Sequence, residues 1–177
     1  MALVGLLLAA SPVAADQTDA RLPALFERLL ATQDDSEASA IEQQIWTIWY
    51  ETADPRINLM MMQGAEAMSV GDFDVALEIY DRVIEDAPEY AEGWNRRATL
   101  YYLMGRFEAS IADVQHVLAL EPRHFGALSG MGLIYTAIED EESAIAWFGK
   151  ALEVNPHMYG IRKRMEDLQE KVAGEPT

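Results

Sequence analysis

Apolar and small side chains recur along this chain with a period of 34 residues. Pro88, Pro122 and Pro156 mark the same point in three successive units. The units run over residues 57–90, 91–124 and 125–158. Six alignment columns hold Met60, Trp94 and Leu128; Gly64, Ala98 and Gly132; Ala67, Tyr101 and Tyr135; Ala76, Ser110 and Ala144; Tyr80, Val114 and Phe148; and Val83, Val117 and Ala151. A fixed period seen in several columns predicts an array of stacked repeats.

Within each unit the columns fall on two helical faces. The fourth, eighth and eleventh positions are spaced as on one side of a helix, and the twentieth, twenty-fourth and twenty-seventh repeat that spacing. Gly71 and Gly105 stand at the fifteenth position, where a chain leaving a helix can turn left-handed. The repeated proline ends the second helix. Each unit is therefore predicted to be a helix–turn–helix, with small residues at positions eight and twenty letting the two backbones approach closely.

Helical patterns also flank the repeats. Residues 159–177 contain a predicted helix over about 159–172, with one apolar face and charged residues elsewhere. The apolar face holds Ile161, Met165, Leu168 and Val172. A repeat array needs a terminal element with a polar outer side, so this segment is interpreted as a capping helix and tail.

Residues 16–56 predict a further pair of helices, over 22–31 and 37–52. Their apolar stripes are Leu22, Leu25, Phe26 and Leu29, and Ile41, Ile45, Ile48 and Trp49. Because Pro55 ends this pair as the later prolines end theirs, we interpret it as a decayed repeat that packs against the first unit. Trp46, Trp49 and Tyr50 make the second helix apolar around much of its circumference. The alternative is that this side is a self-association surface.

Residues 1–15 form an apolar run that ends in small residues. Val13 and Ala15 stand where a signal peptidase reads the chain, and the run is shorter than the roughly 20 residues of a membrane-spanning helix. We therefore expect a signal peptide, a mature chain from Asp16 without an integral membrane span, and a periplasmic or secreted protein. No Lys or Arg precedes the run, so the alternatives are a misassigned start and, without a leader, a cytoplasmic protein.

The composition is strongly acidic, with 30 Asp and Glu against 13 Lys and Arg and a formal net charge of -17. Nucleic-acid affinity comes from Lys and Arg that displace counterions, so we expect no nucleic-acid partner. The chain has no cysteine, which excludes thiol nucleophiles, disulfides and thiolate metal sites.

No residue pattern indicates catalysis. His116, His124 and His157 are too scattered for a metal pair and are interpreted as surface residues near helix ends. The methionine run at 60–62 is interpreted as core and adaptable surface rather than as a soft metal site. We therefore expect no enzyme, no catalytic residue, no metal site and no cofactor.

The second unit resembles the tetratricopeptide repeat (TPR) family. The residues that carry the resemblance are Trp94, Ala98, Tyr101, Gly105, Phe107 and Pro122. Arg97 departs from the family's apolar residue at that position, and we expect it to reach a carboxylate such as Asp113. Glu139 and Glu141 replace the glycine and the aromatic residue of the third turn. The resemblance implies an all-α, right-handed superhelix (solenoid) of helix–turn–helix repeats with a C-terminal capping helix.

The resemblance also implies a protein-binding groove on the concave side, lined by the first helix of each unit, where a peptide or helix would lie. Carried onto this sequence, the groove residues are Asn58, Met61, Ala65, Met68, Asn95, Arg96, Thr99, Tyr102, Leu103, Ser129, Leu133 and Thr136. Arg96 is the charged residue that we expect to contact a ligand. Family members that hold a C-terminal carboxylate use Lys, Asn and further basic residues. The matching places here hold Met61, Ala65, Arg96, Gly126 and Gly130, so we do not expect that mode of binding.

These patterns predict a non-catalytic scaffold or adaptor of the bacterial cell envelope that binds other proteins or peptides. Two alternatives stay open. One is a cytoplasmic three-repeat chaperone for secreted substrates. The other is an accessory subunit of an envelope enzyme, in cytochrome maturation or cell-wall growth.

Overall fold

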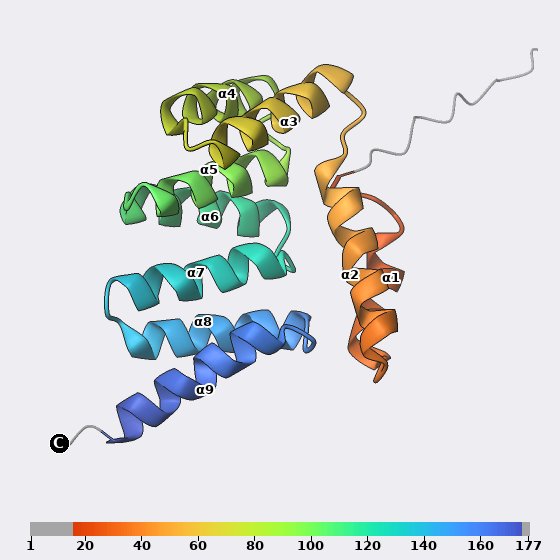
Figure 1. The fold of residues 1–177 in the computed structure, drawn as a ribbon. Helices are drawn as coiled ribbons and strands as arrows, with labels where there is room; N and C mark the ends of the chain where they lie inside the picture. The colour runs from red at the N-terminus through yellow and green to blue at the C-terminus, as the bar shows by residue number, and fades with distance from the viewer. Residues whose placement is uncertain (1–15, 175–177) are drawn as a thin grey trace, which may run out of the picture.

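The structure is a computed structural model, and it describes residues 16–174. These residues form nine α-helices and no strand (Figure 1). The helices are α1 (Leu22–Ala31), α2 (Asp35–Tyr50), α3 (Pro55–Ser69), α4 (Phe73–Asp86), α5 (Ala91–Leu103), α6 (Phe107–Leu120), α7 (Phe125–Ala137), α8 (Glu141–Val154) and α9 (Tyr159–Gly174). The predicted leader at 1–15 lies outside the described residues. Within 16–174 no helix combines the length and the apolarity that crossing a membrane would require.

Helices α3 to α8 form three antiparallel pairs that stack on one another, and α9 packs on α8 (Figure 1). The pairs α3–α4, α5–α6 and α7–α8 fall in the three predicted units, although α3 already begins at Pro55. Each second helix ends two residues before the repeated proline, at Asp86, Leu120 and Val154. The prediction of an all-α TPR solenoid with a C-terminal capping helix is confirmed. We call helices α3 to α9 the array.

The predicted alternation of small and large residues holds the two helices of a unit together. A Cβ atom added to Gly64 would lie 2.6 Å from the ring of Tyr80, and one added to Gly132 would lie closer still to the ring of Phe148. In the second unit the hydroxyl of Ser110 donates a hydrogen bond of 2.7 Å to the carbonyl of Ala98. The helices therefore touch at these positions, with no room for a larger residue in the first and third units.

The three turns between paired helices use the same left-handed backbone. Gly71 and Gly105 have φ values of 79° and 70°, as their position predicted. The third turn has Glu139 at the same place, with φ 62°. A side chain raises the free energy of this conformation, so the third turn carries strain that the first two avoid.

Arg97 lies inside the array because carboxylates on two neighbouring helices surround its guanidinium. It donates to both carboxylate oxygens of Asp113 at 2.8 Å and to Asp81 at 2.6 Å. These bonds, chiefly those with Asp113, hold the pKa of Arg97 above its ordinary value. The expected contact between Arg97 and Asp113 is therefore present, and it joins α5 to α6.

Helices α1 and α2 form a hairpin, here called the N-terminal hairpin, which runs along the side of the array (Figure 1). Its core combines the two predicted apolar stripes with Phe125 from the start of α7. Val154 and Met158, at the join between α8 and α9, pack against the same core. The expectation that this pair packs against the first unit as one more repeat is therefore wrong, because its main apolar contacts are with the third unit and the cap.

The outer face of α3 explains this placement. Position ten of each later unit packs into the core of the unit before it: Leu100 joins the first unit's core and Ile134 the second's. The equivalent residue of α3 is Glu66, and Gln63 stands one turn earlier; both are exposed. A preceding helix stacked here would bury a carboxylate and an amide without partners, which is unfavourable. The hairpin packs elsewhere, where apolar surface is available.

The aromatic side of α2 is partly covered by the chain itself. Trp49 is 1 % exposed and stacks on His124, with ring centroids 4.1 Å apart. Trp46 packs edge-on against Phe125 and lies over Gly126, where a Cβ atom would meet its ring. These contacts bury Trp49 and part of Trp46, whereas Tyr50 is 37 % exposed, so the self-association alternative stays a prediction.

The capping helix α9 has no buried residue. Ile161, Met165 and Leu168 are half-buried, whereas Val172 is exposed. Lys171 forms an ion pair with Glu141 of α8. A helix of this kind closes the array with a polar outer side, as expected of a terminal element.

Candidate functional site

Two hollows lie where the first helices α3, α5 and α7 face outward from the array; we call this surface the first-helix face. The hairpin hollow, of about 470 Å³, lies between the end of α2, α3 and α5. Its lining is Tyr50, Glu51, Asn58, Met61, Met62, Ala65 and Arg96. The central hollow, of about 130 Å³, lies between α5 and α7. Its lining includes Asn95, Thr99, Tyr102, Gly126, Ser129, Gly130 and Leu133.

Most of the predicted groove residues line one of the two hollows. The hairpin hollow takes Asn58, Met61, Ala65 and Arg96, and the central hollow takes Asn95, Thr99, Tyr102, Ser129 and Leu133. Met68 instead packs against the core of the first unit. Leu103 is 51 % exposed at the end of α5, and the hydroxyl of Thr136 donates to the carbonyl of Gly132. The last three residues therefore lie outside both hollows.

Several polar groups on this face already have partners inside the protein. The Asn58 amide bonds both the N–H and the carbonyl of Thr52, at 2.9 and 3.0 Å. The hydroxyls of Thr99 and Ser129 donate to carbonyls of their own helices, at 2.9 and 3.0 Å. These side chains stabilise the local backbone, and the surface left for a partner is mainly apolar.

Arg96 is more constrained than the sequence predicted. Its Nε donates to Glu92 at 2.8 Å, its Nη2 contacts the Tyr50 hydroxyl, and its guanidinium lies 4.6 Å from the centre of the Tyr50 ring. Burial is the largest single effect and lowers the pKa of Arg96, but the combined influence of Glu92, Tyr50 and Tyr80 raises it above its ordinary value. Arg96 therefore has an internal role that the sequence did not predict, since it joins α2 to α5. It also lines the hairpin hollow, and its contact with a ligand stays a prediction.

His124 is fully buried beneath the hairpin, so its interpretation as a surface residue was wrong. Its Nδ1 accepts a hydrogen bond of 3.1 Å from the backbone N–H of Ala127 and caps α7. A backbone amide can only donate, which assigns the ring proton to Nε2, 3.2 Å from a carboxylate oxygen of Glu92. Glu92 thus connects Arg96 and His124 beneath α2, and the Asn95 amide donates to it at 2.9 Å.

The other two histidines are separate from this network. His116 stacks on Trp94, with ring centroids 4.2 Å apart, and His157 bonds the carbonyl of Leu29 at 3.1 Å. Across residues 16–174, no group of three or more His, Cys, Asp or Glu is placed to hold a metal ion.

Sequence reasoning missed the part of the site that the hairpin supplies. Tyr50 and Glu51, at the end of α2, form one wall of the hairpin hollow. Tyr50 is fixed there because the Tyr90 hydroxyl donates to its carbonyl at 2.9 Å. Glu66, at a position where the later units bury an apolar residue, was the available signal that no repeat stacks on α3 and that the hairpin lies elsewhere.

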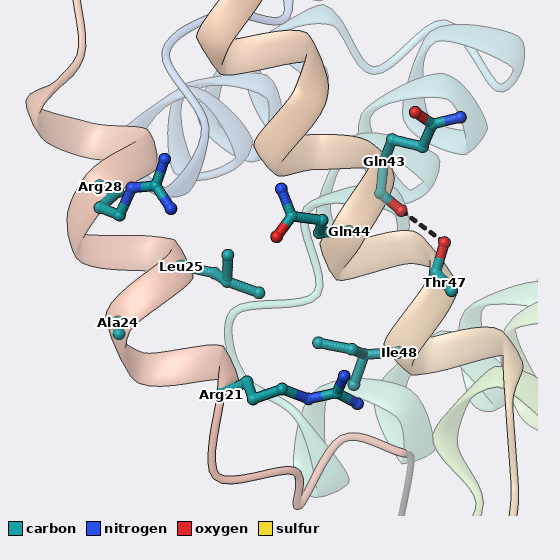
Figure 2. Close-up of a pocket in the computed structure, with 8 residues that line it drawn as sticks. All are labelled: Arg21, Ala24, Leu25, Arg28, Gln43, Gln44, Thr47 and Ile48. Atoms are coloured by element: carbon teal, nitrogen blue, oxygen red, sulfur yellow. Dashed lines mark hydrogen bonds between the residues drawn. The ribbon is translucent and has the colours of Figure 1, made fainter.

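A further groove, of about 470 Å³, runs along the outer side of the hairpin between α1 and α2. Figure 2 shows Leu25 and Arg28 from α1, with Arg21 just before it, facing Gln44 and Ile48 from α2. Both arginines already have partners: Arg21 bonds Asp19 through two nitrogens, and Arg28 bonds Glu37. The cations beside this groove are therefore largely neutralised.

Comparison with known proteins identifies the family. A model of the tetratricopeptide repeat matches residues 61–115 and 95–158, together more than half of the chain. The chain belongs to the tetratricopeptide repeat family. A TPR repeat-containing protein of Rhizobium etli is 37% identical over 157 residues, which cover 89% of this chain and 77% of the relative. Because this match extends beyond the family model, it includes part of the hairpin or the cap as well as the repeats.

Solved TPR structures share the fold. The first TPR of Spaghetti (RPAP3), bound to an HSP90 peptide, aligns with a TM-score of 0.63 and 19% identity over 67% of this chain and 94% of that one. The TPR2B domain of yeast Sti1, in a pHsp70 complex, aligns with a TM-score of 0.59 and 22% identity over 68% and 98% of the two chains. Identities this low show the fold alone. TPR domains are protein–protein interaction modules, and this chain has that architecture.

Proposed function

We propose that this TPR protein is a non-catalytic scaffold that holds a segment of another protein on its first-helix face. The observation that supports this most is that α5 lines both hollows, through Arg96 in one and the adjacent Asn95 in the other. A partner segment could thus contact α3, α5 and α7 together. The RPAP3 and Sti1 structures, which contain an HSP90 peptide and pHsp70, support the same use of the fold.

The side chains of this face favour binding over chemistry. The hydroxyls of Thr99 and Ser129 donate to backbone carbonyls, and neither has a neighbouring base in the lining of the central hollow. The guanidinium of Arg96 is bonded to Glu92. A nucleophile needs an adjacent base within hydrogen-bond reach, and the described lining of the two hollows offers no such pair.

The proposal places the scaffold in the bacterial cell envelope. Its support is the apolar run at 1–15, which ends in small residues in the manner of a cleaved leader. N-terminal sequencing of the protein purified from its native cell tests this part separately. A chain that starts at Asp16 agrees with export, whereas a chain that retains Met1 opposes it.

The experiment for the scaffold uses photo-crosslinking in the native cell. A photoreactive residue is placed at Leu133 in the central hollow, at Met62 in the hairpin hollow, or at the exposed Ala112 of α6 as a control. We expect the same protein partner to be captured from Leu133 and Met62 and not from Ala112. Equal capture from all three positions, or capture from Ala112 alone, would contradict the proposal.

A further inference from the structure

The first-helix face has few charged side chains. Among the described residues that line the two hollows, Arg96 is the only cation and Glu51 the only carboxylate. The charge of Arg96 is offset by Glu92, which is 1 % exposed and bonds it at 2.8 Å. The Glu51 carboxylate is exposed and makes no hydrogen bond or salt bridge with the described residues. It interacts electrostatically with Arg21, whose guanidinium is bonded to Asp19. The negative charge of Glu51 is therefore only partly offset at the edge of the hairpin hollow.

Residues around the hairpin hollow add further negative charge. One turn beyond Met62 on α3, the exposed Glu66 adds a second carboxylate at a position that no helix covers. The whole chain carries a formal charge of -17, which raises the local concentration of cationic segments and speeds their encounter. An acidic segment would meet repulsion here, because Arg96 is partly buried and bonded to Glu92, and Arg21 is bonded to Asp19.

The lining of the hairpin hollow favours an apolar residue. Met61 and Ala65 form its α3 side, Met62 is 70 % exposed at its rim, and Tyr50 closes it from the hairpin. Its volume of about 470 Å³ lies within the roughly 300–1,000 Å³ that binding clefts offer. Methionine side chains adapt their shape to different partners and bind apolar groups well. Without Tyr50 and Glu51 from the hairpin, this hollow would lack one wall and its carboxylate.

We propose that the partner segment is basic and apolar, with a bulky apolar side chain in the hairpin hollow and a Lys or Arg beside Glu51. This inference rests on the proposed scaffold function and specifies the chemistry of its partner. The hairpin is then part of the binding site, and a TPR array that lacks it would not have this specificity.

A library of random dodecapeptides displayed on phage, selected against the purified chain, tests the inference without a known partner. We expect enriched peptides to carry net positive charge and a Met, Leu or Phe, and to bind Ala65→Trp at least about tenfold more weakly, since a tryptophan fills the hollow. The same substitution at the exposed Ala112 of α6 is the matched control and should leave affinity unchanged.

Charge is tested with the enriched peptides and Glu51→Lys. We expect about three- to fivefold weaker binding at low salt, and a smaller effect as salt is added, because exposed ion pairs are weak and screened. Glu78→Lys makes the same charge change at an exposed position of α4 and should have little effect. Enriched peptides that are acidic or neutral, or that bind Ala65→Trp as well as the native chain, would overturn the inference.

Failure of the scaffold itself would look different. Gly130→Trp fills the central hollow, where a side chain at Gly130 meets open space. Peptides that lose affinity for Gly130→Trp and not for Ala65→Trp would leave the scaffold in place and remove the hairpin hollow from its site. Peptides insensitive to both substitutions, or no enriched peptide, would contradict the scaffold and the inference together.

Discussion

The array and the N-terminal hairpin are joined by contacts of different kinds. Within the array, a small residue of one helix receives a large residue of the next, as with Gly132 and Phe148, and the pattern recurs in each unit. The hairpin is held by aromatic stacking and by polar contacts that occur once each. Trp49 stacks on His124, and the side-chain amide of Asn155 donates to Glu42 at 2.7 Å.

This difference shows how an element outside the repeat pattern can become part of the site. Repeating contacts position α3, α5 and α7 and so create the first-helix face. The unique contacts position Tyr50 and Glu51 above one end of that face. Damage to the two kinds of contact should therefore have separable consequences, for the hairpin in one case and for the array in the other.

The largest effect is expected from Trp49→Ala. This residue is buried between hairpin and array, and removal of a buried tryptophan side chain costs about 3–5 kcal/mol. Hydrogen exchange should show protection lost across α1 and α2 and largely kept in α5 to α8, which have their own core. Trp147→Ala, at a half-buried residue of α8, is the control and should cost less. Equal loss of protection in both regions would show that hairpin and array unfold as one unit.

Two glycines of α7 test the contacts within the array. Gly132→Ala should destabilise the protein by about 1–3 kcal/mol, because the added methyl group meets the Phe148 ring. Gly130→Ala adds the same group where nothing lies within 4 Å, and should stabilise the helix by about 0.5–1 kcal/mol. Urea unfolding followed by circular dichroism measures both. The same sign for the two changes would contradict the close packing of paired helices.

Two tyrosines compare a bonded hydroxyl with an unbonded one. Tyr90→Phe removes the hydrogen bond to the Tyr50 carbonyl and should cost about 1 kcal/mol. The Tyr80 hydroxyl is buried without a hydrogen-bond partner in residues 16–174, so Tyr80→Phe should stabilise by about 1 kcal/mol. Thermal unfolding measures both changes. A loss of stability in Tyr80→Phe would reveal a partner for this hydroxyl.

The buried Tyr80 hydroxyl should also make the free energy of unfolding depend on pH. Burial raises the pKa of Tyr80 to about 12, so the folded state keeps its proton after an unfolded tyrosine, with a pKa near 10, has lost it. The free energy of unfolding should therefore be unaffected by this group below pH 10 and should fall as pH rises from about 10 to about 12, because only the unfolded tyrosine ionises in that range. Urea titrations at several alkaline pH values should show a shallower decline for Tyr80→Phe than for the native chain.

A further small effect is expected at the third turn. Glu139→Gly should stabilise the protein by about 1 kcal/mol, because glycine adopts the observed φ of 62° without strain. Gly105→Ala is the reciprocal change in the second turn, where φ is 70°, and should destabilise by a similar amount. A loss of stability in Glu139→Gly, beside the expected loss in Gly105→Ala, would mean that the backbone at the third turn differs from the left-handed form.

The array could be predicted from the sequence because its contacts repeat. Each column of small or large residues appears in several units, so Gly64 and Tyr80 predict the contact that Gly132 and Phe148 repeat. The contact between Arg97 and Asp113 was predictable because both residues belong to one unit.

The position of the hairpin could not be predicted in the same way. Its partners, such as His124 and Asn155, lie far along the chain and occur in no repeated column. The site was therefore predicted only as far as the first helices supply it, and Tyr50 and Glu51 were missed. For Arg96, position predicted a charge on the first-helix face. Its pairing with Glu92, four residues earlier on α5, follows from helical spacing, but its contact with Tyr50 depends on how α2 packs.

The hairpin lies along the array and forms one wall of the hairpin hollow, and the proposed site depends on this placement. The Tyr159 hydroxyl donates to Asp35 at 2.6 Å, which brings the start of α2 beside the start of α9. Because the chain has no native cysteine, Asp35→Cys with Tyr159→Cys can be tested with a short bis-maleimide, beside a Glu141→Cys and Lys171→Cys control pair on α8 and α9. We predict rapid intramolecular cross-linking of both pairs in the monomer. Cross-linking of the control pair alone would contradict the account, since a hairpin stacked on α3 would hold residue 35 far from residue 159.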